Sequence, residues 1–267
     1  MHRRPAVAGR FYPARPQELT RDLERYLERG TPPQRAVACV VPHAGIMYSG
    51  HVAGAVYARL EPASSYIILC PNHTGCGRPL AIMSAGDWET PLGNVPIDSA
   101  LAEALKRACP ALEEDEEAHR FEHSLEVQLP FLQHLQKDFR IVPIAVSVGR
   151  YEPLAELGRA LARVVAPAAP RPLLVASSDL NHYEPDQVNR LKDRQAIDQI
   201  LALDPRGLYD TVHRERISMC GYGPTVAVLT AARELGARQA ELVRYATSGD
   251  ITGDRSAVVG YAGIVIR

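Results

Sequence analysis

The sequence has 267 residues, and its 30 lysines and arginines face 31 aspartates and glutamates, so the formal net charge is −1 with histidine neutral. This balance argues against a general nucleic-acid or anionic-membrane binder, because such proteins carry an excess of positive charge. The apolar share of 46% is enough for a large core and excludes a disordered chain.

Hydrophobic segments of the kind that enter membranes are missing from the sequence. No apolar run approaches the roughly 18 residues that a membrane-spanning helix needs. Residues 1–10 also lack the hydrophobic stretch of a signal peptide. We therefore expect a soluble, cytoplasmic protein with no membrane partner.

Strand-like and helical segments alternate along the chain. Short apolar runs predict buried strands over residues 36–41, 66–70, 140–147, 173–176, 242–247 and 257–266. Apolar residues at helical spacing predict helices over residues 17–29, 50–60, 99–108, 123–136, 153–165, 187–201 and 224–235. This alternation predicts an α/β fold, a single domain over residues 1–267 with a central mixed, largely parallel sheet flanked by helices.

Three segments between these elements carry signals of their own. The Gly- and Pro-rich stretch at residues 87–96, which follows an apolar run at 80–84, indicates a hairpin or an ordered loop. The acidic run at 113–117 indicates a solvated surface. Pro130 is expected to kink or restart the helix in which it lies.

The cysteines argue against a disulfide framework or a structural zinc ribbon, because five is an odd number and no C-x-x-C pair occurs. Cys39, Cys70 and Cys109 lie in apolar patterns and are expected to pack in the core, whereas Cys76 is a loop thiol. Cys220 lies in a glycine-rich segment just before a predicted helix. Backbone amides and the helix dipole favour a thiolate there, which is the form that binds metals and acts as a nucleophile. The alternative is that Cys220 is a small buried hydrophobic residue.

Polar side chains follow three of the predicted strands. His43 and His73 each come just after a buried strand, and Asp179 and His182 lie in the turn after a third. Ligands of open α/β sheets bind outside the carboxyl ends of the strands, so the two strand-end histidines could meet at one metal ion. Asp179 and His182 suit proton transfer. The alternatives are hydrogen-bonded turn histidines in the first case, and a capping aspartate with a surface histidine in the second.

Two further observations narrow the choice of function. His123 begins a predicted helix and could turn inward. The motifs G-x-G-x-x-G, G-x-x-x-x-G-K-[ST], H-E-x-x-H and G-x-S-x-G are missing. Nucleotide-dependent, zincin and α/β-hydrolase functions therefore lose their main support.

Seven blocks of the sequence resemble the Memo family, and they occur in order over most of the chain. They are residues 8–13 (AGRFYP), 41–45 (VPHAG), 71–73 (PNH), 88–93 (WETPLG), 122–130 (EHSLEVQLP), 177–183 (SSDLNHY) and 220–224 (CGYGP). The resemblance implies a single α/β domain similar to class III extradiol dioxygenases. It also implies companions of the AMMECR and radical-SAM types.

The resemblance further implies a metal pocket. His43, His73 and Cys220 match the metal ligands of the Memo pattern, and His182 matches the acid/base histidine of the dioxygenases, with Asp179 beside it. Iron, as Fe(II), or copper is the metal that the family is linked to. A thiolate in place of the dioxygenase carboxylate favours Cu(I) or a thiolate-bound iron, so ring cleavage is not implied by the fold.

The same pattern marks residues around that pocket. An aromatic side chain matches at Phe11 or Tyr12, Tyr48 matches a pocket tyrosine, and His123 lies in a matching block. The leading hypothesis is a redox-active metalloprotein that acts on a small molecule. A second is a peptide- or partner-binding module that uses a vestigial pocket, and a third is metal-free catalysis by the Cys220 thiol.

Overall fold

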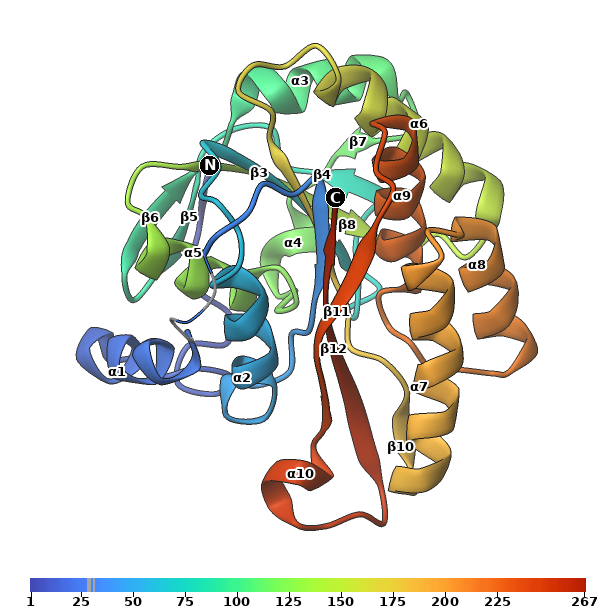
Figure 1. The fold of residues 1–267 in the computed structure, drawn as a ribbon. Helices are drawn as coiled ribbons and strands as arrows, with labels where there is room; N and C mark the ends of the chain where they lie inside the picture. The colour runs from blue at the N-terminus through green and yellow to red at the C-terminus, as the bar shows by residue number, and fades with distance from the viewer. Residues whose placement is uncertain (28–29, 31) are drawn as a thin grey trace.

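A mixed sheet of nine strands runs through the middle of the molecule in the computed structural model, which describes all residues except 28, 29 and 31 (Figure 1). Its strands are β2 (Ala38–Val41), β3 (Ser65–Pro71), β4 (Leu80–Ile82), β7 (Glu113–Glu114), β8 (Arg140–Val146), β9 (Leu173–Ser177), β10 (His182–Glu184), β11 (Ala240–Thr247) and β12 (Val258–Ile266). Their order is β10-β12-β2-β9-β3-β8-β4-β7, and β11 pairs with β12.

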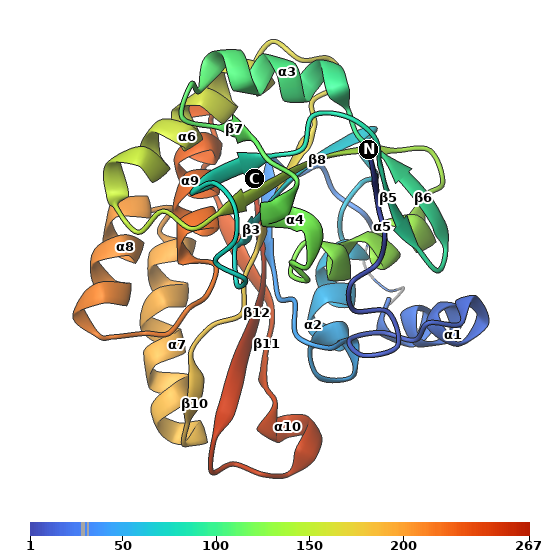
Figure 2. The same ribbon diagram turned by 180° about the vertical axis from the view of Figure 1, so that it is seen from behind.

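Parallel pairing is concentrated in the centre of this sheet. Strands β2, β9, β3 and β8 are parallel neighbours, whereas β12 and β4 flank them in antiparallel orientation. The predicted mixed α/β sheet is therefore confirmed. The smaller sheet joins β1 (His2–Arg3), β5 (Asp87–Thr90) and β6 (Gly93–Pro96), and its β5–β6 hairpin lies in the predicted Gly- and Pro-rich stretch (Figure 2).

Helices cover both faces of the central sheet. They are α1 (Pro16–Tyr26), α2 (Ile46–Tyr57), α3 (Ser99–Ala108), α4 (Glu117–Arg120), α5 (Leu129–Leu135), α6 (Tyr151–Val165), α7 (Asp186–Leu201), α8 (Pro205–Arg214), α9 (Tyr222–Glu234) and α10 (Gly249–Thr252). Figures 1 and 2 show α1, α2 and α5 on one side and α6, α7, α8 and α9 on the other. A 3₁₀ turn over Glu126–Gln128 precedes α5, and Pro130 lies in the first turn of α5. The predicted restart at this proline is confirmed.

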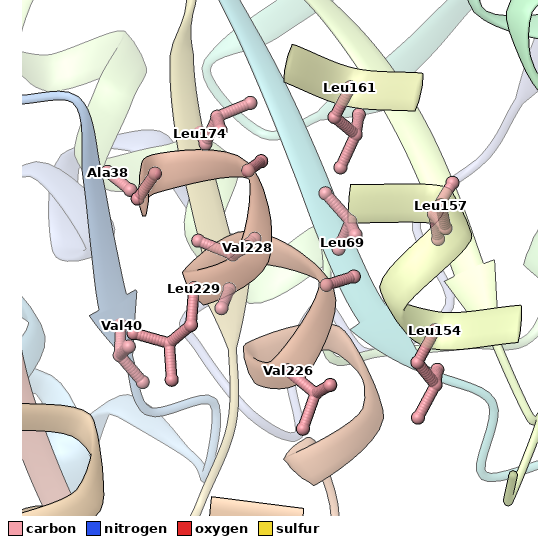
Figure 3. Packing of buried hydrophobic residues seen from close by; sticks show 14 of the residues in the cluster. Ala38, Val40, Leu69, Leu154, Leu157, Leu161, Leu174, Val226, Val228 and Leu229 are labelled. Carbon is pink, nitrogen blue, oxygen red and sulfur yellow. The ribbon is translucent and has the colours of Figure 1, made fainter. Parts of the chain in front are cut away.

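Alternating side chains of each central strand feed two separate cores. In β2, Ala38 and Val40 join the core under α6 and α9, whereas Cys39 and Val41 join the core under α1, α2 and α5. Both faces are covered, so the strand is apolar at every position. Figure 3 shows the first core, in which strand residues meet helical leucines and valines: Ala38, Val40, Leu69, Leu174, Leu154, Leu157, Leu161, Val226, Val228 and Leu229. The expected packing of Cys39, Cys70 and Cys109 in the core is confirmed.

The structure departs from the predicted elements in several places, and short elements such as β7, β10, α4 and α10 were not predicted. Helix α8 was not predicted, although Asp204 caps it and Pro205 begins it. Helix α2 begins at Ile46 and ends at Tyr57, earlier than the predicted 50–60. Helix α1 ends at Tyr26, and residues 28, 29 and 31 of the predicted helix and its stop lie outside the described residues. Among the helices that the structure describes, none has the length and apolar character to cross a membrane.

Candidate metal centre

The parallel centre of the sheet brings the predicted site residues to one edge. Strands β2, β9 and β3 are parallel neighbours, so their carboxyl ends lie side by side. His43 follows β2, Asp179 follows β9 and His73 follows β3. The strand order therefore puts β9 between the two histidines. This is the edge at which open α/β sheets bind ligands.

Three histidines converge at this edge. One ring nitrogen from each of His43, His73 and His123 lies within 4.8 Å of the others, and we call these residues the histidine cluster. The ring centroids of His73 and His123 are 4.5 Å apart and nearly stacked, and His43 stands edge-on to both. His43 is buried, while the His73 side chain is 33% exposed. The cluster therefore has one buried wall and one side open to solvent.

His43 is held in a buried polar environment. Its Nδ1 lies 2.9 Å from Ser177 Oγ, at the end of β9. Burial lowers the pKa of His43 well below its ordinary value, and the neighbouring His123 and His73 lower it further. The imidazole is therefore neutral near pH 7, which is the form that binds metals.

His73 is held by Glu122, a buried carboxylate. Glu122 accepts hydrogen bonds from the His73 amide at 2.5 Å and its Nδ1 at 2.9 Å, and from the Ser124 amide and hydroxyl at 2.9 and 2.7 Å. Burial favours the protonated acid, but the hydrogen bonds from His73 and Ser124 outweigh it and lower the pKa of Glu122 to about 2. A carboxylate behind a ligating histidine fixes its orientation and leaves Nε2 free.

Sequence reasoning assigned no role to Glu122. The available signal was its place directly before His123 in the block at residues 122–130. Gln128 and Ser177 also lie in such blocks, and the sequence indicated no role for them. Spacing alone did not connect Glu122 with His73, because the two residues are 49 positions apart in the sequence.

His123 is the third member of the cluster and carries an aromatic neighbour. Burial lowers its pKa. The Phe11 ring lies 4.6 Å from the His123 ring. Tyr12 is buried, and its hydroxyl donates to Glu126 Oε1 at 2.5 Å. Of the two aromatic residues considered for the pocket, Phe11 is thus the one whose ring contacts the cluster.

Tyr48, the other predicted pocket tyrosine, lies in the first turn of α2. It is half-buried and packs against a small apolar group formed by Val52, Ala246 and Tyr261. Ala44, the residue after His43, packs against the same group. Tyr48 therefore belongs to the wall next to the His43 turn.

Cys220 lies next to the histidine cluster. Its Sγ is 3.3 Å from His43 Nε2 and 3.7 Å from the Asp179 carbonyl. Gly221 caps α9 at this point, and a Cβ there would collide with the Ser177 carbonyl and the Ser178 side chain. A glycine is therefore needed for the chain to bring the thiol this close to β9.

The predicted thiolate at Cys220 is wrong for the free protein. Burial raises the pKa of Cys220, and the nearby Asp179 raises it further. These effects outweigh the backbone amides at the start of α9, so the thiol is protonated near pH 7. The sulfur becomes a thiolate only when a metal ion compensates its charge.

Asp179 ties the end of β9 to the end of β2. Its Oδ1 accepts hydrogen bonds from the amides of His43 at 2.7 Å and Ala44 at 3.3 Å, and its Oδ2 lies 3.9 Å from His43 Nε2. Burial raises its pKa, and the His43 amide only partly opposes that effect. Asp179 thus contacts the cluster directly, as well as fixing the turn that carries His43.

His182 is oriented by the backbone of the segment that carries Cys220. The His182 Nδ1 lies 2.9 Å from the Ser218 carbonyl, which can only accept, so Nδ1 carries the proton. Nε2 is therefore the basic nitrogen of the neutral ring. A charge on His182 lowers the pKa of both Asp179 and His43, so the ring interacts with the site.

A buried asparagine fixes the distance between these two segments. Asn181 Oδ1 accepts hydrogen bonds from the backbone N–H and the hydroxyl of Ser218 at 2.9 and 3.0 Å. The backbone N–H of Asn181 donates to Asp193 Oδ1 at 2.8 Å. The Ser218 hydroxyl in turn lies 2.8 Å from the His182 amide. Asn181 therefore joins the turn with Asp179 and His182 to the segment that leads to Cys220.

Comparison of the sequence with known proteins identifies a family. The family model described as "Memo-like protein" matches residues 3–265. A MEMO1 family protein of Methanosarcina mazei is 45% identical over 267 residues, which cover 99% of each chain. A second, from Methanothermobacter thermautotrophicus, is 45% identical over 274 residues and covers 98% of this chain and 99% of its own.

A solved structure shows the same fold at low sequence identity. The crystal structure of an uncharacterized protein from Escherichia coli K12 has a TM-score of 0.58 and 16% identity, and it covers 86% of this chain and 100% of its own. At this identity the likeness concerns the fold alone. The family match and the relatives cover nearly the whole sequence, and the chain belongs to the Memo family.

Proposed function

We propose that the chain binds one redox-active transition metal ion, Fe(II) or copper, at the histidine cluster, with His43, His73 and Cys220 as ligands and His123 as a further donor. The observation that carries this proposal is the convergence of three ring nitrogens within 4.8 Å, with the Cys220 sulfur 3.3 Å from His43 Nε2. The three imidazoles come from three separate segments, and the Cys220 sulfur, from a fourth, lies beside one of them, His43.

The chemistry of the donors fits these metals. Imidazole nitrogens suit iron and copper, and a thiolate adds softness that favours Cu(I) or ferrous iron over magnesium or calcium. Burial keeps His43 and His123 neutral, as ligation requires. Glu122 and Ser177 hold the far nitrogens of His73 and His43, which orients the rings toward a common ion.

The neighbouring residues suit a proton-transfer role around a bound small molecule. When bound, the metal supplies Lewis acidity and electron exchange. His182 presents Nε2 as its basic atom, because Nδ1 donates to the Ser218 carbonyl. Asp179 holds the His43 turn through the amides of His43 and Ala44. We assign His182 to accept or return a proton at Nε2, with Asp179 as the neighbouring carboxyl group.

The two other functions have less support. A peptide-binding pocket was argued partly from Tyr12, whose hydroxyl is already bonded to the buried Glu126 carboxylate. Metal-free thiol catalysis needs a reactive thiolate, and burial raises the pKa of Cys220 instead. Metal binding is supported by the observed contacts among the three histidines and between His43 and the Cys220 thiol.

X-ray absorption on anaerobically loaded protein tests the proposed ligands. Protein titrated with one equivalent of Fe(II) or Cu(I) is expected to show nitrogen ligands together with a sulfur ligand at about 2.3 Å, the usual length of a metal–thiolate bond. The Cys220→Ser variant should lose the sulfur signal and keep the nitrogen signal. Cys76→Ser, which changes an exposed loop thiol, is the matched control. Metal affinity that is unchanged in His43→Ala, His73→Ala and Cys220→Ser would reject the site.

A further inference from the structure

We propose that Ser177, Gln128 and Tyr57 form a hydrogen-bond chain that fixes His43 as the Nδ1–H tautomer and leaves its Nε2 lone pair directed at the cluster. These three residues would act as positioning residues, because they touch His43 or one another and not the metal. The tautomer follows from the protein alone, and its consequence for metal affinity rests on the proposed function.

The orientation of the Gln128 side-chain amide is determined by its hydrogen-bond partners. One partner of Nε2, at 3.0 Å, is the Pro42 carbonyl, which can only accept. The nitrogen of the amide must therefore face Pro42. The amide oxygen then faces Tyr57, whose hydroxyl donates to Oε1 at 2.8 Å.

Gln128 determines the next step at Ser177. The second proton of Gln128 Nε2 is donated to Ser177 Oγ at 2.9 Å. The hydroxyl of Ser177 donates its single proton to the Ser124 carbonyl at 2.7 Å. Two oxygens at that distance without a proton between them would repel each other, so the proton lies there.

The remaining lone pair of Ser177 Oγ faces His43. A hydroxyl has one proton and two acceptor positions, and the contacts to Ser124 and Gln128 use the proton and one acceptor position. The contact of 2.9 Å to His43 Nδ1 therefore requires that Nδ1 donates. The neutral ring then carries its lone pair on Nε2, the atom 3.3 Å from Cys220 Sγ.

Burial makes this assignment costly to reverse. His43 and Tyr57 are each 1% exposed, and Ser124, Gln128 and Ser177 are 0% exposed. Water therefore does not substitute for a lost partner. An Nε2–H tautomer would leave two acceptors, Nδ1 and Oγ, facing each other inside the protein, and an unsatisfied buried group of this kind is expensive.

The chain reaches from α2, which carries Tyr57, through the turn before α5 to the end of β9. Removing a hydrogen-bond partner of a ligating histidine typically lowers metal affinity by roughly 10–100-fold. The same loss is expected when Ser177 is changed, although Ser177 contacts no metal.

Nitrogen NMR on metal-free protein tests the tautomer directly. Proton–nitrogen correlation spectra of histidine-labelled protein at pH 8 distinguish a protonated from an unprotonated ring nitrogen, and the His43→Gln spectrum assigns the His43 signals. Wild type should show Nδ1 protonated and Nε2 unprotonated at His43. The opposite pattern in wild type would overturn the proposal, whatever the protein does with metals.

Two variants measure the contribution of the chain. Ser177→Ala should introduce the Nε2–H form and lower Fe(II) or Cu(I) affinity by roughly 10–100-fold. Gln128→Met should shift the His43 nitrogen signals in the same direction and serves if Ser177→Ala does not fold. Thr230→Val, which removes a buried hydroxyl bonded within α9, should match wild type in both measurements. Variants with the wild-type tautomer and affinity would contradict the proposal. Wild type with the expected tautomer but no metal affinity would instead reject the proposed function alone.

Discussion

His43 and His119 are both fully buried histidines, and they differ in what surrounds them. Burial lowers the pKa of each: well below its ordinary value for His43, and to about 4 for His119, where the charge of Arg3 contributes next. The His119 ring stands edge-on to Trp88 with centroids 5.8 Å apart. His43 stands edge-on to His73 and has a thiol 3.3 Å from its Nε2.

The comparison shows that burial and a lowered pKa do not by themselves mark a functional site. Both properties follow from removing an imidazole from water. What separates His43 is the convergence of other donors, which results from its place after a central parallel strand. His119 lies in the short helix α4 and is not a member of the histidine cluster. A position at the end of a central strand is therefore stronger evidence of a functional site than burial or a lowered pKa.

The largest expected effect separates these two histidines directly. His43→Ala should weaken Fe(II) or Cu(I) binding by more than about 100-fold, because losing a ligand exceeds the roughly 10–100-fold cost of losing a ligand's partner. His119→Leu should leave the affinity of the folded protein unchanged. Anaerobic competition titrations with a chromogenic chelator measure both values. Equal losses in the two variants would remove the distinction between the histidines.

Glu122→Gln should lower metal affinity by roughly 10–100-fold while the ligands stay in place. Glu122 accepts four hydrogen bonds from His73 and Ser124. A glutamine side chain has only one acceptor oxygen, and its NH₂ group would face some of these donors. Glu117→Gln, at an exposed ion pair with Arg120, is the control. An affinity equal to wild type would show that Glu122 does not orient His73.

The same carboxylate predicts how stability depends on pH. The pKa of Glu122 is lowered from 4.5 to about 2 in the folded protein, so its stabilising effect is complete above pH 4.5 and is lost as pH falls toward 2. The shift corresponds to about 3 kcal/mol of unfolding free energy. Urea denaturation at pH 3 and pH 6 should show a smaller decrease for Glu122→Gln than for wild type. Equal pH dependence in both would contradict this account.

The sequence predicted the repeating parts of this molecule better than the irregular ones. Helix α3 has the predicted bounds, because its Asp98 cap and its apolar spacing are both local signals. Helix α8 was not predicted, although Asp204 caps it and Leu208 and Val212 are spaced as in a helix. Helix α8 carries the same two kinds of local signal, a cap and apolar residues at helical spacing, so the sequence held enough information to predict it.

In the site, too, residues that follow a local sequence pattern were predicted, and residues that depend on long-range packing were not. His43 and His73 were found because each follows an apolar strand, which the sequence displays. The partners Glu122 and Ser177 were not found, because their hydrogen bonds depend on how distant strands and turns pack. The orientation of neighbouring aromatics was equally hidden: Phe11 faces His123, and the next residue faces Glu126.

Gly221→Ala should destabilise the protein by about 1–3 kcal/mol, the usual cost of forcing extra atoms into a packed site. The added methyl group would collide with the Ser177 carbonyl and the Ser178 side chain, so relief requires moving the segment that carries Cys220. Gly149→Ala, whose added carbon would meet only the Tyr222 hydroxyl at 3.5 Å, should be nearly neutral. Urea denaturation of the metal-free variants compares the two. Equal stabilities would argue against the close packing at Gly221.

The smallest expected effect is the release of one proton. Burial raises the pKa of Cys220, so the thiol is protonated near pH 7 and must lose its proton to bind metal as a thiolate. Calorimetric titrations in buffers with different heats of ionisation should report about one proton per metal for wild type and none for Cys220→Ser. Zero protons in wild type would place the sulfur outside the coordination shell and leave the histidine cluster as the binding group.

Anomalous diffraction from anaerobic crystals loaded with Fe(II) or Cu(I) tests the central claim most directly. We expect one strong peak at the metal absorption edge, about 2.0–2.3 Å from His43 Nε2, His73 Nε2 and Cys220 Sγ. A metal bound elsewhere, or a cluster that stays empty in crystals holding that metal, would contradict the account.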